Sequence, residues 1–122
     1  MYTVNLMAGW LSFIAGAGSG ALIGLQFHKK DWLGGYSSFA RRLLRLGHIA
    51  FFGIGILNIL FAQSVNNINN IWIDYASILF LSAFSMSLVC FLTAWKKPFR
   101  HLFFIPAGST MLAVILTVIG LY

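Results

Sequence analysis

The fold is decided by residues 4–27, VNLMAGWLSFIAGAGSGALIGLQF, in which no side chain is charged. Three further windows also lack Asp, Glu, Lys and Arg: 46–73, 75–95 and 101–122. A helix needs about 20 mainly apolar residues to cross a hydrocarbon core of about 30 Å, and each window is long enough. The windows are continuously apolar rather than alternating, which favours membrane-spanning helices over the strands of a β-barrel.

We therefore predict an all-α integral membrane protein, a four-transmembrane-helix bundle in a single membrane domain. The predicted spans are residues 4–27, 46–62, 71–95 and 102–121, with inner loops at 28–45 and 96–101 and an outer loop at 63–70. The composition agrees, because 60% of the 122 residues are hydrophobic and 8% are charged, against about 25% charged residues in a soluble domain. These values exclude a water-soluble globule and a disordered chain, and a single cysteine excludes an intrachain disulfide scaffold.

The basic residues predict the orientation of the bundle. All of them lie in the two inner loops: Lys29, Lys30, Arg41, Arg42, Arg45, Lys96, Lys97 and Arg100. Because cytoplasmic loops carry an excess of Lys and Arg, this side is predicted to be cytoplasmic, with both termini on the other side. We expect a multi-pass protein of a membrane of the bacterial inner (cytoplasmic) type, with anionic lipid rather than nucleic acid at the basic loops. Within the first loop, Ser37 or Ser38 is predicted to cap a helix that starts near Phe39.

Small residues predict where the helices pack. A stripe of them recurs every four residues along the first span: Ala8, Ser12, Gly16, Gly20, Gly24 and, at its end, His28. Small side chains allow helix backbones to approach closely in lipid, so Ser12, Gly16, Gly20 and Gly24 are predicted packing residues. The partner of the stripe stays open between the second span, a second copy and another protein. Asn58 is the amide near the middle of the bilayer, and we expect it to face the bundle and form hydrogen bonds.

The histidines suggest a cofactor site. The stretches HIAFFGIG (48–55) and HLFFIPAG (101–108) are similar and each follows a basic loop, which suggests two parallel hairpin repeats. Two neutral imidazoles on facing helices can ligate a b-type haem. We predict His48 and His101 as ligands of the haem iron, His28 nearby, and Arg45 and Arg100 as partners of the propionates. Interface or structural histidines, or histidines that contact a metal, a quinone or a lipid headgroup, are the alternatives.

The same residues limit the function. No carboxylate lies deep in any span, which disfavours proton-coupled export, and no motif of a hydrolase, an ATPase or a dinucleotide-binding enzyme is present. We expect a small accessory subunit of a larger membrane complex, with no catalytic activity of its own. The complex would be an electron-transport one, with the haem near the cytoplasmic face. The first alternative is a homo-oligomeric channel or small-solute transporter lined by Asn58 and hydroxyl side chains. The second is a lipid-active enzyme that uses His48 and Arg45.

Overall fold

The computed structural model describes residues 2–35 and 37–122, and all regular secondary structure in these residues is helical. Its α-helices are α1 (Thr3–Phe27), α2 (Phe39–Ser64), α3 (Ile71–Ser82), α4 (Ser85–Trp95) and α5 (Phe104–Leu121). Two short 3-10 helices, η1 (Trp32–Gly34) and η2 (Lys97–Phe103), lie in the connections. Four helical segments are long and apolar enough to cross a membrane, counting α3 with α4 and η2 with α5. The all-α, four-span architecture of a multi-pass membrane protein is therefore confirmed, whereas its sidedness and its internal repeat stay predictions.

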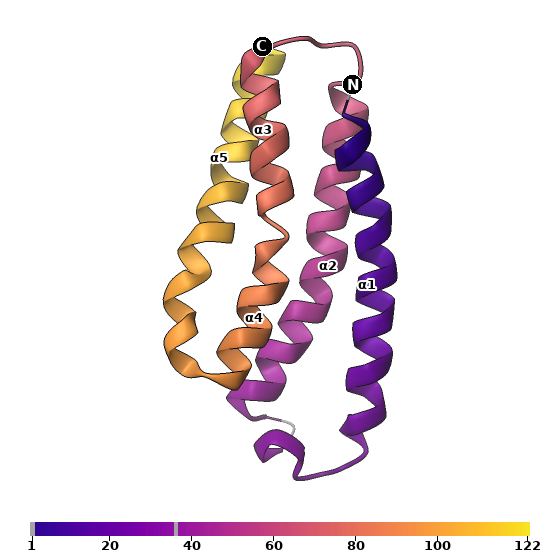
Figure 1. Cartoon of the computed structure of the whole chain (residues 1–122), viewed down its shortest axis with the longest axis vertical. Helices are drawn as coiled ribbons and strands as arrows, with labels where there is room; N and C mark the ends of the chain where they lie inside the picture. The colour runs from indigo at the N-terminus through magenta and orange to yellow at the C-terminus, as the bar shows by residue number, and fades with distance from the viewer. Residues whose placement is uncertain (1, 36) are drawn as a thin grey trace.

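The four spans form a bundle in which spans that are consecutive in the chain lie side by side (Figure 1). α1 packs along α2, α2 along α4, and α3 along α5. The two termini and the loop 65–70 lie at one end, which we call the amide end after its asparagines. The loops that carry the basic residues lie at the other end, which we call the basic end. α1 and α5 are the peripheral helices. Only 17% of the residues in the apolar part of the first span, and 11% in that of the fourth span, are buried.

α2 begins at Phe39, inside the stretch that was predicted as an inner loop. The cause is an N-cap, as the serines before it predict: the Ser38 hydroxyl oxygen accepts a hydrogen bond of 3.2 Å from the backbone N–H of Arg41. Arg41, Arg42 and Arg45 therefore lie on the first turns of α2.

The third span is interrupted, which the hydropathy of residues 71–95 does not reveal. α3 ends at Ser82 and α4 begins at Ser85. The side-chain amide of Asn58 donates a 3.1 Å hydrogen bond to the carbonyl of Phe80, the group that the N–H of Phe84 would use in a continuous helix. The N–H of Phe84 instead bonds the carbonyl of Leu81 at 3.2 Å. A side chain of α2 thus replaces one backbone hydrogen bond of the third span.

The face of α1 that packs against α2 differs from the predicted stripe at both ends. It begins with Asn5 and Gly9, where an added Cβ at Gly9 would lie 2.7 Å from the carbonyl oxygen of Gly55. It continues through Gly16, where a Cβ would lie 2.7 Å from the Phe52 ring. At Gly24, by contrast, a Cβ would meet no atom within 4 Å. A spacing of four residues rotates by about 40° per step around a helix of 3.6 residues per turn, so the stripe leaves the contact face.

Candidate functional site

A groove runs between α1 and α2 in the half of the bundle near the basic end. It encloses about 360 Å³ and is lined by Gly20, Ile23, Gly24 and Phe27 from α1 and by Arg45, His48 and Ile49 from α2. The groove exists because two of the α1 residues have no side chain, so the backbone of α1 forms part of its floor. It brings together two of the predicted site residues, Arg45 and His48.

His48 fills the space that Gly20 leaves on α1. An added Cβ at Gly20 would overlap the imidazole ring, so this position requires glycine while His48 keeps its place. The ring packs edge-on against Phe52, with 5.5 Å between the ring centroids, and its Nδ1 lies 3.4 Å from the hydroxyl oxygen of Ser19. His48 is therefore half-buried at the contact of α1 with α2.

Arg45 supplies the positive charge of the groove. It precedes His48 by three residues, so the two side chains share one face of α2. Its guanidinium carbon lies 5.9 Å from the centroid of the Phe27 ring, within the range of a cation–π contact. The charge consequently lies at the end of the groove nearest the basic loops, and the imidazole lies about one turn deeper.

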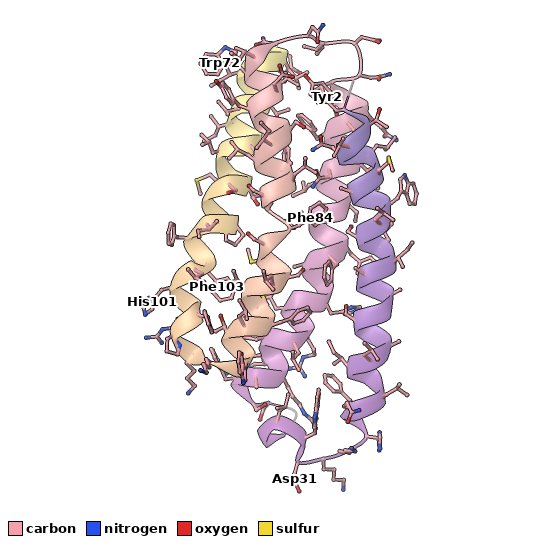
Figure 2. The ribbon with its side chains drawn as sticks, in the orientation of Figure 1. Tyr2, Asp31, Trp72, Phe84, His101 and Phe103 are labelled. Atoms are coloured by element: carbon pink, nitrogen blue, oxygen red, sulfur yellow. The ribbon has the colours of Figure 1, made fainter. Side chains whose placement is uncertain are left out.

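The other predicted site residues lie outside the groove. His101 and Arg100 belong to η2 and are exposed, and His101 is at the edge of the bundle opposite α1 (Figure 2). His28 follows the last turn of α1 and is exposed. His48 faces α1 while His101 faces outward, so the structure does not bring the two predicted iron ligands together. Haem ligation stays a prediction.

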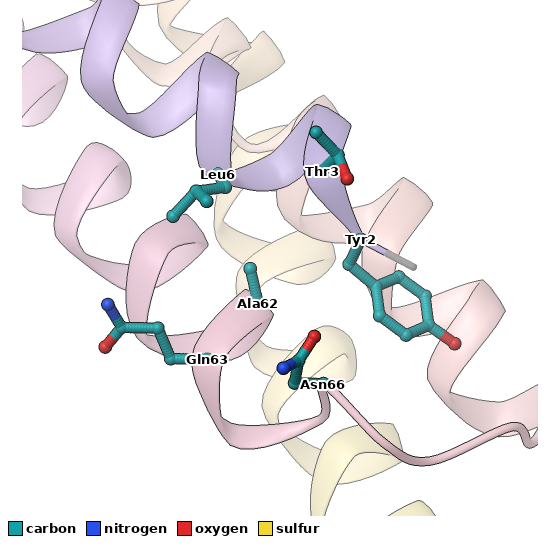
Figure 3. Close-up of a pocket in the computed structure, with 6 residues that line it drawn as sticks. All are labelled: Tyr2, Thr3, Leu6, Ala62, Gln63 and Asn66. Atoms are coloured by element: carbon teal, nitrogen blue, oxygen red, sulfur yellow. The ribbon is translucent and has the colours of Figure 1, made fainter.

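A second depression lies at the amide end, between the start of α1 and the end of α2 (Figure 3). It encloses about 210 Å³ and is lined by Tyr2, Thr3, Leu6, Ala62, Gln63 and Asn66. The Tyr2 hydroxyl donates a 2.8 Å hydrogen bond to a carboxylate oxygen of Asp74 on α3. Burial, and next this hydrogen bond and the negative charge of Asp74, raise the pKa of Tyr2 to about 12. Tyr2 therefore stays protonated at neutral pH and ties the start of α1 to α3.

The interior polar groups bond one another. Asn58 is completely buried, and its side-chain oxygen accepts a 2.8 Å hydrogen bond from the Asn5 amide. The Asn58 amide donates to the carbonyls of Ile54 and Phe80, at 3.0 and 3.1 Å. Asn5 in turn donates to the Ser77 carbonyl at 3.1 Å and accepts from the Ser77 hydroxyl. Asn58 therefore joins α1, α2 and α3 instead of facing an open path.

Several hydroxyls of the spans, the side chains considered as the lining of a pore, are also paired. Ser12 donates to the carbonyl of Phe51 at 2.9 Å, and Ser87 donates to the carbonyl of Gly47 at 2.8 Å, so both join neighbouring helices. Across residues 2–35 and 37–122, the Ser85 hydroxyl is the one buried side-chain polar group without a partner. It lies beside the interruption of the third span, where the regular helical carbonyl pattern is lost.

Arg41 has a role that the sequence did not reveal. It was grouped with the lipid-facing basic residues, but it is only 2% exposed. Its Nε donates a 2.6 Å hydrogen bond to the Trp32 carbonyl, and a terminal nitrogen donates to the carbonyl of Lys29. Its guanidinium carbon lies 5.1 and 5.5 Å from the ring centroids of Phe27 and Trp32. Arg41 thus fixes the loop between α1 and α2 through its contacts with Trp32 and Lys29.

The described residues form no metal centre, and the comparisons with known proteins give no match. Within the described part of the chain, no three His, Cys, Asp or Glu side chains gather so that they could hold a metal ion. The chain matches no protein-family model, no curated protein and no solved structure.

Proposed function

We propose that this chain is a small membrane subunit without a catalytic centre of its own, and that it joins another membrane helix through the outer face of α1. We define the outer face as the exposed residues that point away from α2: Met7, Leu11, Ile14, Gly18, Ala21 and Leu25.

The outer face carries the proposal. Its four large side chains are between 58 and 70% exposed, and an added Cβ at Gly18 would meet no atom within 4 Å. Successive members are alternately four and three residues apart, the spacing by which one helix packs along another. Gly18 and Ala21 in the middle of the face allow the close approach that helix association in lipid requires.

The outer face is separate from the predicted stripe, two glycines of which are used within the chain. Gly16 and Gly20 pack against Phe52 and His48 of α2, which leaves the outer face as the part of α1 open to a partner. The interior supports a structural subunit as well, because the amides of Asn5 and Asn58 already hold three helices together.

A role in electron transport with a b-type haem is a narrower version of this proposal. Of the three histidines, only His48 lines the groove, and Arg45 beside it could meet a propionate. The groove thus offers one imidazole of this chain, and a second axial ligand would have to come from a partner.

Site-specific photo-crosslinking tests the proposal. A benzophenone side chain placed at Ile14, on the outer face, should give one discrete adduct with a second polypeptide in the native membrane. The matched control is Ile115 on α5, which is also an exposed isoleucine and should give only lipid adducts. Gly18→Leu should abolish the adduct from position 14, because four added carbons separate the helices. Lipid adducts alone from both positions would reject the outer face as an interface.

A further inference from the structure

The groove between α1 and α2 has the shape and charge to hold one lipid molecule. We infer that it binds an anionic phospholipid, with one acyl chain along Ile23 and Gly24 and the phosphate at Arg45. The inference does not depend on the outer face of α1, which points away from α2.

The shape of the groove fits an acyl chain. It follows the helix axes from Gly20 to Phe27, a length of about 10 Å at the helical rise. Its walls include the side chains of Ile23 and Ile49, and its floor at Gly24 is bare backbone with no protein atom within 4 Å of an added Cβ. An apolar groove between two helices suits a hydrocarbon chain, which lies along the same direction in a bilayer.

The charge at the mouth of the groove fits a phosphate. Arg45 lines the groove at its end nearest the basic loops, where all eight Lys and Arg residues of the chain gather. A guanidinium presents parallel donors that match two oxygens of a phosphate. The polar and apolar parts of the groove are therefore arranged in the order in which a phospholipid presents its headgroup and its chain.

The same charge argues against a second copy of the chain as the occupant. Two copies inserted in the same orientation would bring their basic ends together, and like charges near each other repel. Asp31 is the one acidic residue in the basic loops, and it cannot neutralise eight cations. An anionic lipid supplies the opposite charge at the required depth.

Native mass spectrometry of the purified chain, with added phosphatidylglycerol or phosphatidylcholine, tests the site. The wild-type chain should retain one phosphatidylglycerol in preference to phosphatidylcholine. Gly24→Leu should abolish this adduct, because the leucine occupies the groove from a position where an added Cβ meets no protein atom within 4 Å. Arg45→Gln should weaken it about fivefold, the effect of one basic residue near an anionic surface.

Two control variants make the same changes on the other side of the bundle. Gly108→Leu adds a side chain at an open glycine of α5, and Arg100→Gln removes an exposed charge from η2. Both should retain the phosphatidylglycerol adduct of the wild type. The helical circular dichroism of every variant confirms that it is folded. Equal binding of both lipids would overturn the inference. So would full binding by Gly24→Leu, or an equal loss in Arg100→Gln and Arg45→Gln.

Discussion

Asn58→Leu removes the side chain that joins α2 to both α1 and α3. Two hydrogen bonds between helices are lost, one from the Asn5 amide at 2.8 Å and one to the Phe80 carbonyl at 3.1 Å. Hydrogen bonds between membrane helices contribute on average about 0.6 and at most about 1.7 kcal/mol each. The free energy of unfolding should therefore fall by about 1–3 kcal/mol, the sum for two such bonds.

The substitution should also change the third span. Without the Asn58 amide, the carbonyl of Phe80 becomes available to the N–H of Phe84, the partner that it has in a regular α-helix. The interruption between α3 and α4 should shorten, and hydrogen exchange at the Phe84 amide should become slower.

Unfolding in mixed micelles, followed by circular dichroism, measures the loss of stability. Combination with Asn5→Ala forms a double-mutant cycle, in which the two residues should couple by about 0.5–1.7 kcal/mol. Asn67→Leu is the control, since this exposed asparagine of the loop 65–70 should change stability by less than about 0.5 kcal/mol. If Asn58→Leu is as stable as the wild type, or its effect is additive with that of Asn5→Ala, the interior network does not hold the helices together.

Four further predictions concern other parts of the molecule. Gly20→Leu should lower the free energy of unfolding by about 1–3 kcal/mol because the new side chain overlaps a ring of α2, and an unchanged stability would contradict this contact. Burial and its hydrogen bond raise the pKa of Tyr2 from 10.0 to about 12, so the stability lost in Tyr2→Phe should be seen below pH 10 and should vanish as the pH rises to about 12. In a cysteine-free background, Asn67→Cys should be labelled from outside the cell and Ser38→Cys only from the cytoplasm, and the reverse pattern would invert the orientation. If the chain binds haem, its dithionite-reduced spectrum should show a b-type α-band that His48→Ala removes, whereas a featureless spectrum from haem-rich expression would exclude a haem site.

Much of the fold could be predicted because membrane insertion depends on averaged hydropathy. The four uncharged windows were sufficient to place the spans, and the serines before Phe39 were sufficient to place the start of α2. The interruption after Ser82 could not be predicted, because it depends on a contact between Asn58 and Phe80, which only the packed bundle brings together.

The candidate site was predictable only in part. Arg45 and His48 lie on one regular helix, where a spacing of three residues places them on one face. His101 was placed by the similarity of its stretch to the one at His48, but it lies in a 3-10 helix rather than in a regular α-helix, so the similarity does not place it on the equivalent face. Arg41 could not be separated from the other basic residues, because its burial arises from the fold of the loop around Trp32.

The mass of the particle extracted from the native membrane separates a subunit from a protein that works alone. If the chain is a subunit, the extracted particle contains the 13.5 kDa chain and another membrane polypeptide in a fixed ratio, and Gly18→Leu releases the chain from it. If the wild-type chain is instead extracted as a single 13.5 kDa chain that carries only lipid, and Gly18→Leu gives the same particle, then the outer face of α1 meets lipid and the proposed assembly is wrong.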